Sequence, residues 1–234
     1  MKRKDSKFLA ENMDSLHDIL QLLTTKQQEE LRRNMSVQLF KKNETLYQEG
    51  EVPQMFHCLI SGKVKIYKDG IGGRTQIIRV VKPVEYFGYR AYFANQNYVT
   101  SAAAFETSTV CLIPNELMEK WVMENSDLAL YIIKLLAVEV GNSDQRTVNL
   151  TQKHIRGRLA ESLIFLRDNY GLEEDGATLS IYLSREDLAN MSNMTTSNAI
   201  RTLSAFAQEK IIAIDGKKIK IIDGESLEKI NKIG

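Results

Sequence analysis

The residues between 195 and 208 carry polar side chains at helical spacing and include no acid. Hydroxyl, amide and guanidinium groups are the ones that bond base edges and phosphates, whereas carboxylates would repel phosphates. A solvated helix usually carries mixed Lys and Glu instead. The pattern therefore favours contact with duplex DNA, with Ile200, Leu203 and Phe206 facing inward. The expected contact residues are Thr195, Thr196, Ser197, Asn198, Arg201 and Ser204, and Gln208 extends the same face.

A helix-turn-helix would position this face. Ser184 is placed to cap a first helix, with Asp187 three residues later. Leu188 and Met191 would face inward, and Ala189 is small enough for a close helix crossing. Ser192-Asn193-Met194 interrupts the helix, because Asn tolerates the left-handed backbone that a tight turn needs. Thr195 would then cap the second helix.

A hairpin is expected next, with strands over 211–214 and 219–222 and a turn at Asp215-Gly216. Three lysines cluster on it: Lys217, Lys218 and Lys220. The net charge of the chain is only +1, and from Leu150 onward 12 Lys and Arg face 12 Asp and Glu. Phosphate binding therefore needs a local cationic surface. A basic wing beside the second helix would supply it, and Lys217 and Lys218 are its expected DNA contacts.

Short β-rich runs separated by turn residues fill residues 37–114. Examples are Met55–Ile60 and Thr75–Val81, with a glycine-rich loop over 69–73 before the second. Many short antiparallel strands favour a small β-barrel or jelly roll. The residues before them look helical, with Leu16, Ile19 and Leu23 in register and Thr25 preceding a second helix.

A long apolar helix is expected after Pro114, capped by Asn125 or Ser126. Its stripe is Leu128, Tyr131, Ile132, Leu135, Leu136, Val138 and Val140. Packing on the barrel alone is possible, but the width of the stripe favours a second contact with a symmetry mate.

A further helix is expected from His154 to Tyr170, with Ile155, Leu159, Leu163 and Leu166 inside and Gly171 at its end. A short strand over 178–183 should follow it. The predicted fold class is α+β. Its expected segments are N-terminal helices (1–36), a barrel sensor (37–114), a dimerisation helix and hinge (115–152) and a winged helix-turn-helix (153–234).

Composition argues against several other classes of protein. Cys58 and Cys111 lie far apart without CxxC spacing, so neither a disulfide framework nor structural zinc is expected. Three histidines and no nucleophile–base arrangement argue against an enzyme and against a metal site. No apolar run approaches the roughly 18 residues that span a bilayer. The basic N-terminus lacks the apolar stretch of a signal peptide, so a cytoplasmic protein without membrane contact is expected.

In its motifs and their order the chain resembles the cyclic-AMP receptor and fumarate-nitrate regulator (CRP/FNR) family over about residues 22–222. The resemblance rests on Gly50, on 56–67, on Phe87-Gly88, on Ile155–Ala160 and on Leu183–Ala189 through Arg201. It implies a homodimer in which a small effector, bound between barrel and central helix, reorients two DNA-reading domains. These domains would read a palindromic site and recruit or block RNA polymerase. The alternative is a sensor or protein-interaction module without specific DNA binding.

Departures from the family pattern bear on the effector. Cyclic-nucleotide binders of the family have Gly-Glu where this chain has Gly88-Tyr89, and Arg-Ser or Arg-Thr where it has Val99-Thr100. A buried phosphate without a cation is costly, so weak or no cyclic-AMP binding is expected. The resemblance makes these the candidate pocket residues for an unknown effector: Tyr89, Arg90, Thr100, Ser143 and Asp144. No cysteine precedes Cys58, so the family's iron–sulfur cluster is not expected. Thr196-Ser197 stands where many relatives have Arg and Glu, so the half-site should differ.

Overall fold

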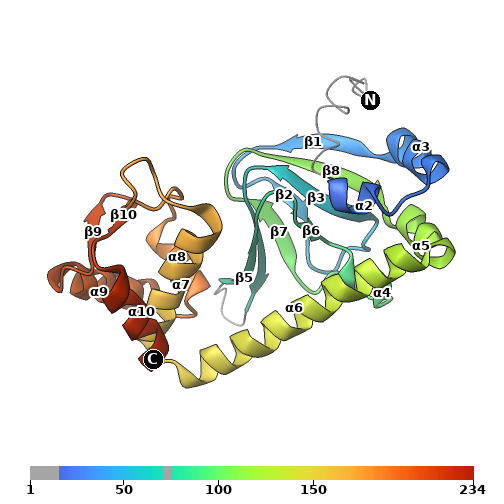
Figure 1. Cartoon of the computed structure of the whole chain (residues 1–234). Helices are drawn as coiled ribbons and strands as arrows, with labels where there is room; N and C mark the ends of the chain where they lie inside the picture. The colour runs from blue at the N-terminus through green and yellow to red at the C-terminus, as the bar shows by residue number, and fades with distance from the viewer. Residues whose placement is uncertain (1–15, 71–74) are drawn as a thin grey trace. The chain divides into compact units, whose positions relative to one another are not determined.

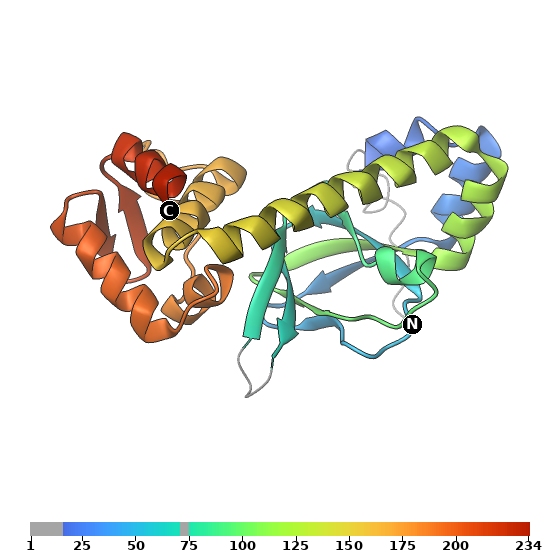
Figure 2. The same cartoon turned by 90° about the horizontal axis from the view of Figure 1, so that it is seen from below.

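The computed structural model describes residues 16–70 and 75–234 of the 234-residue chain (Figures 1 and 2). The chain divides into two compact units. The first takes in the chain up to Lys68 together with Ile78–Val140, and the second takes in Asp69–Ile77 together with Gly141–Gly234. Of the expected N-terminal helical segment, residues 1–15 lie outside the described part, as do Gly72 and Gly73 of the expected hairpin loop.

The β-rich segment forms two antiparallel four-stranded sheets, in the orders β1-β8-β3-β6 and β2-β7-β4-β5. Each sheet keeps two edge strands, so the segment is a jelly-roll type of sandwich, the second of the two alternatives that the sequence predicts. The strands are β1 (Ser36–Phe40), β2 (Thr45–Tyr47), β3 (Met55–Ser61), β4 (Val64–Asp69), β5 (Thr75–Val81), β6 (Tyr86–Phe87), β7 (Ser101–Ala104) and β8 (Ser108–Pro114).

Two apolar clusters hold the first unit together. One contains Leu59, Val64, Phe87 and Val110 and is built from residues of both sheets. The other contains Phe56 and Trp121 and joins β3, β6 and β8 to helices. Cys58 and Cys111 belong to this second cluster as buried thiols. The sequence did not indicate that they are register partners on neighbouring strands β3 and β8.

Short helices gather at one end of the sandwich beside the first turns of α6 (Figures 1 and 2). They are α2 (His17–Leu20), α3 (Thr25–Asn34) and α5 (Asn115–Glu124), and α4 (Arg90–Phe93) follows β6. Thr25, which was expected to precede α3, is its first residue, and the cap is Thr24, because a capping box pairs Thr24 with Gln27.

The long helix α6 (Ser126–Gln152) is capped by Asn125, whose side-chain oxygen accepts hydrogen bonds from the N–H groups of Asp127 and Leu128. Asn125 is therefore the cap among the two candidates. Leu128 and Ile132 are buried in the first unit, as the sequence predicts. Four apolar side chains of the same helix are half exposed or more: Leu130, Ile133, Val138 and Val140. One side of α6 thus packs on its own sandwich and another side presents apolar surface.

The second unit contains α7 (Ile155–Tyr170), α8 (Arg185–Met191), α9 (Thr196–Gln208), β9 (Ile212–Asp215), β10 (Lys218–Ile221) and α10 (Gly224–Ile233). Two expectations are wrong here. Ile155 is exposed at the first turn of α7, while Leu159, Leu163 and Leu166 form the core. Residues 178–183 form no strand, because only Thr178 and Leu179 make isolated bridges. Helix α10, which packs along α7, was not predicted from the sequence.

Candidate nucleic-acid interface and effector pocket

The turn between α8 and α9 is built by the local hydrogen bonds that the sequence predicts. Ser184 Oγ accepts the Asp187 N–H at 3.0 Å, and Thr195 Oγ1 accepts the Asn198 N–H at 3.2 Å. Asn193 adopts a left-handed φ of +48°, the conformation that this turn requires. The two caps and the turn therefore confirm the helix-turn-helix.

Arg158 of α7 ties this turn to the rest of the unit. Its Nε donates to the Ser192 carbonyl at 3.0 Å and its Nη2 to the Asn193 carbonyl at 3.3 Å. A third bond, from Nη1 to the Lys153 carbonyl at 3.0 Å, reaches the start of α7. In the sequence, Arg158 stands out only as part of a family motif. In the structure it satisfies carbonyls at two helix ends and so positions α9.

Helix α9 presents its polar side to solvent. Ala199, Thr202, Leu203 and Phe206 are buried. The exposed residues are Thr196, Ser197, Ile200, Arg201, Ser204 and Gln208. The expectation that Ile200 faces inward is wrong, since its side chain is 47% exposed. Positions 199, 202, 203 and 206 complete the buried stripe, and residue 200 is rotated about 100° from residue 199 on the helix.

Arg201 lies on this face with most of its donors available. The Nη2 of Arg201 donates to Asn198 Oδ1 at 2.6 Å, one helical turn earlier. A guanidinium carries five N–H donors, so this bond orients the group and leaves others for a ligand. No acid lies between Thr195 and Gln208. Asn198 and Arg201 together offer an amide and a cation on one exposed surface.

The wing carries less free positive charge than the sequence suggests. Lys218 pairs with Glu173 at 3.6 Å, and Lys220 pairs with Asp175 at 3.1 Å. Hydrogen bonds from the backbone N–H groups of Thr178 and Ala177 hold the pKa of Asp175 below its usual value, so this acid stays ionised. In the part of the chain that the structure describes, no carboxylate pairs with exposed Lys217.

A further cation, Arg185 at the start of α8, is bonded to the tip of the wing. Its Nη2 donates to the Gly216 carbonyl at 2.7 Å. In the sequence, Arg185 stands out only as part of a family motif. Lys217 follows Gly216 in the hairpin loop, so this bond places two cations, Arg185 and Lys217, at the tip of the hairpin.

The candidate effector residues of the first unit have different partners. Tyr89 is buried, and its hydroxyl donates to Glu139 of α6 at 3.1 Å. Arg90 is exposed at the first residue of α4. Half-buried Thr100 is hydrogen-bonded to Tyr47. Ser143 and Asp144 lie on the part of α6 that belongs to the second unit, and both are exposed.

An ion-pair cluster that no sequence pattern indicated lies beside Tyr89. The Arg79 guanidinium contacts both Glu139 and Glu85, and it donates to the Tyr86 carbonyl at 3.3 Å. Burial alone would lower the pKa of Arg79, but the two carboxylates raise it above its usual value. Burial and Glu139 raise the pKa of Tyr89, so its phenol stays protonated and donates to that carboxylate. Where the family pattern has a ligand-binding carboxylate, this chain has a phenol that is already bonded.

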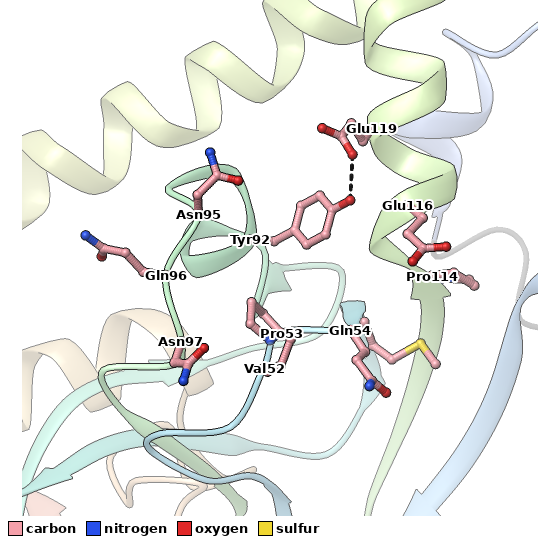
Figure 3. Close-up of a pocket in the computed structure, with 11 residues that line it drawn as sticks. Val52, Pro53, Gln54, Tyr92, Asn95, Gln96, Asn97, Pro114, Glu116 and Glu119 are labelled. Atoms are coloured by element: carbon pink, nitrogen blue, oxygen red, sulfur yellow. Dashed lines mark hydrogen bonds between the residues drawn. The ribbon is translucent and has the colours of Figure 1, made fainter.

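A surface pocket of about 610 Å³ lies elsewhere on the first unit (Figure 3). The turn after α4, the loop before β3 and the start of α5 form its walls, and Tyr92 donates to Glu119 across one side at 2.6 Å. None of the five candidate effector residues lines this pocket. It is therefore a feature separate from the one that the resemblance indicates.

Two models of known domain families match the chain. The cyclic nucleotide-binding domain model matches residues 37–125, and the Crp-like helix-turn-helix domain model matches residues 157–230. The chain belongs to the CRP/FNR family. It is therefore a transcription regulator with a helix-turn-helix DNA-binding domain, as the sequence predicts.

Individual relatives are distant but cover most of the chain. A CRP-like cAMP-activated global transcriptional regulator of Mycobacterium tuberculosis is 24% identical, over 80% of this chain and 84% of that protein. The transcriptional activator protein Anr of Pseudomonas protegens is 25% identical, over 78% and 75%. A crystal structure of a putative crp/fnr regulator from Eubacterium rectale shares the fold, with a TM-score of 0.79, 18% identity and coverage of 92% and 97%.

No group of three or more His, Cys, Asp or Glu side chains among residues 16–70 and 75–234 is arranged to hold a metal ion. Within the same ranges, no helix is long and apolar enough to cross a membrane.

Proposed function

We propose that this CRP/FNR regulator binds a palindromic duplex DNA site as a homodimer and that it responds to a small effector other than cyclic AMP. The observation that carries the DNA-binding proposal is the exposed, acid-free polar side of α9. The proposed contacts are Thr195, Thr196, Ser197, Asn198, Arg201 and Ser204 on the helix, with Lys217 and Lys218 on the wing. RNA polymerase, in the cytoplasm, is the proposed partner of the bound regulator.

The dimer proposal rests on the exposed apolar side of α6. Leu130, Ile133 and Val140 are 50%, 59% and 61% exposed. With Ala137 they follow the alternating three- and four-residue spacing of a coiled-coil seam. A second copy of the same helix would cover this seam symmetrically. Residues 115–152 are accordingly proposed as the dimerisation segment between a sensor (37–114) and a DNA reader (153–234).

The effector proposal rests on Tyr89. In the family pattern, a free carboxylate binds the ribose of the cyclic nucleotide and a cation binds its phosphate. Here Tyr89 is bonded to Glu139, and Val99-Thr100 offers no cation. We propose Tyr89, Arg90 and Thr100 as effector contacts, and the resemblance adds Ser143 and Asp144. Titration with cyclic AMP should leave both the calorimetric signal and the DNA affinity unchanged, and saturable binding at micromolar concentration would contradict this.

Arg201→Ala tests the DNA-reading surface. A library of random-sequence duplexes is first selected on the parent chain, and affinities for the selected duplex are then compared by fluorescence anisotropy. We expect a loss of roughly 1–3 kcal/mol of specific affinity and relaxed selection at one base pair of each half-site. Arg33→Ala is the matched control, because it removes the same charge from an exposed site on α3.

Three outcomes would oppose the proposal. The parent could select no sequence, its affinity could be indifferent to salt, or Arg201→Ala could bind selected and random duplexes as the parent does. Salt-indifferent binding would favour a protein-interaction module, because phosphate neutralisation makes DNA binding strongly salt-dependent.

A further inference from the structure

One side chain on the reading face of α9 does not fit a purely polar contact. Ile200 is 47% exposed on a helix whose other exposed residues from Thr196 to Gln208 are polar. It lies four residues after Thr196 and four before Ser204, so these three side chains follow one line along the helix. Arg201 is its immediate neighbour. Ile200 therefore stands in the middle of the proposed DNA contact and not at its margin.

The exposure of Ile200 is not explained by packing within its own unit. The buried stripe of α9 is complete without it, since Ala199 and Leu203 fill the neighbouring inner positions. A large apolar side chain gains free energy only when something apolar covers it. On the edges of base pairs in the major groove, the apolar group is the C5 methyl of thymine. The other groups exposed there are hydrogen-bond donors and acceptors, for which isoleucine has no partner atoms.

We infer that Ile200 is a specificity residue that selects thymine by packing against the C5 methyl group of the base. This inference rests on the proposed DNA-binding function. The contact lies beside the base pair that Arg201 reads, because adjacent residues on one helix face reach neighbouring positions in the groove. The β-branched side chain is stiff at χ1, so little conformational freedom is lost when it packs on a methyl group. Each protomer makes the contact once, so a palindromic site carries it twice.

Deoxyuridine isolates this contact, because it lacks only the methyl group and keeps the pairing edge and the O4 acceptor of thymidine. A random duplex library is selected on the full-length parent chain. Each enriched thymine of the selected site is then replaced by deoxyuridine in both half-sites, and affinity is measured by anisotropy at fixed salt. At one position we expect about a fourfold loss per half-site, the factor that corresponds to burial of one methyl-sized group at about 0.8 kcal/mol.

Three variants assign the effect to the side chain. Ile200→Ser should bind the thymine and deoxyuridine sites equally, and Ile200→Val should keep most of the discrimination because it keeps a branched apolar surface. Ile233→Ser is the matched control, an exposed isoleucine on α10 of the same unit, and it should discriminate as the parent does. Unchanged thermal unfolding of each variant checks that the exposed substitutions leave the fold intact.

The outcomes separate this inference from the function on which it rests. If the parent enriches no sequence, the proposed DNA-reading function fails. If it enriches a site but every deoxyuridine substitution is neutral, or if Ile200→Ser discriminates as strongly as the parent, the DNA-reading function stands and the role of Ile200 is wrong. In that case the exposed isoleucine serves a contact other than a base, such as a protein partner.

Discussion

The two wing lysines at 217 and 220 should contribute unequally to DNA binding, although both lie on the same hairpin. Lys220 is paired with Asp175 at 3.1 Å, whereas no carboxylate pairs with Lys217 in the described part of the chain. Asp175 is itself fixed by two backbone N–H groups and stays ionised. The Lys220–Asp175 pair therefore presents no net charge to a phosphate, while Lys217 presents a full one.

The size of the difference follows from counterion release. The logarithm of the binding constant falls linearly as the logarithm of the salt concentration rises. Each phosphate that a cation neutralises adds about 0.9 to the steepness of this fall, which is called the slope below. A dimer uses two wings, so Lys217→Ala should lower the slope by about 1.8. Over a fourfold change of salt, the parent should then lose about 12-fold more affinity than the variant does. Lys220→Ala should change the slope by well under about 1, and Asp175→Asn should raise it by up to about 1.8 because it frees Lys220.

The assay is fluorescence anisotropy on a selected duplex across a series of salt concentrations, with the parent, Lys217→Ala, Lys220→Ala and Asp175→Asn measured in parallel. Random duplex is the second probe, since loss of a phosphate contact should weaken binding to every sequence alike. Equal slopes for the two lysine variants, or a larger effect of Lys220→Ala, would refute the reasoning that the ion pairs of the wing set its effective charge.

Four further predictions concern assembly and stability. Ile133→Lys should shift the chain toward monomer by on the order of 100-fold in sedimentation velocity, because two symmetric apolar side chains lose their burial, and an unchanged dissociation constant would exclude the α6 seam. Burial raises the pKa of Cys111 to about 12 and that of Cys58 further, so neither thiol should react with iodoacetamide at pH 8 before unfolding; labelling at the rate of a free thiol would contradict this. Burial lowers the pKa of His57 from its ordinary value of 6.5 to about 4, so the unfolded chain binds the proton first. The free energy of unfolding should therefore fall by about 3 kcal/mol as the pH drops through that range. His57→Gln should remove this part of the pH dependence in urea titrations. Gly88→Ala should lower Tm, because Gly88 has a φ of +79° and a Cβ at this residue would lie 2.5 Å from His57 Nδ1.

Features that depend on near neighbours in the chain were predictable. Ser184 and Thr195 cap their helices and Asn193 turns the chain between them, because each of these features is decided by hydrogen bonds or backbone preferences within a few residues. The apolar period of α6 predicted that Leu128 and Ile132 pack on the sandwich, but Leu130 and Ile133 of the proposed dimer seam lie outside the expected stripe. The jelly-roll alternative for the β-rich segment was also correct, although sequence alone did not exclude a closed barrel.

Features that depend on distant parts of the chain needed the tertiary structure. Only the fold places Arg79 against Glu139, 60 residues away, and pairs Lys220 with Asp175 across a loop. Ile200 shows the same limit in a single residue: its helical period was correct, but the width of the buried stripe depends on how closely α7 and α8 approach α9. Local sequence decides where helices and turns form, because capping and periodicity act over a few residues. Long-range packing decides which charges pair and which side of a helix stays exposed. It brings together residues that are far apart in the chain, so no short stretch of sequence predicts it.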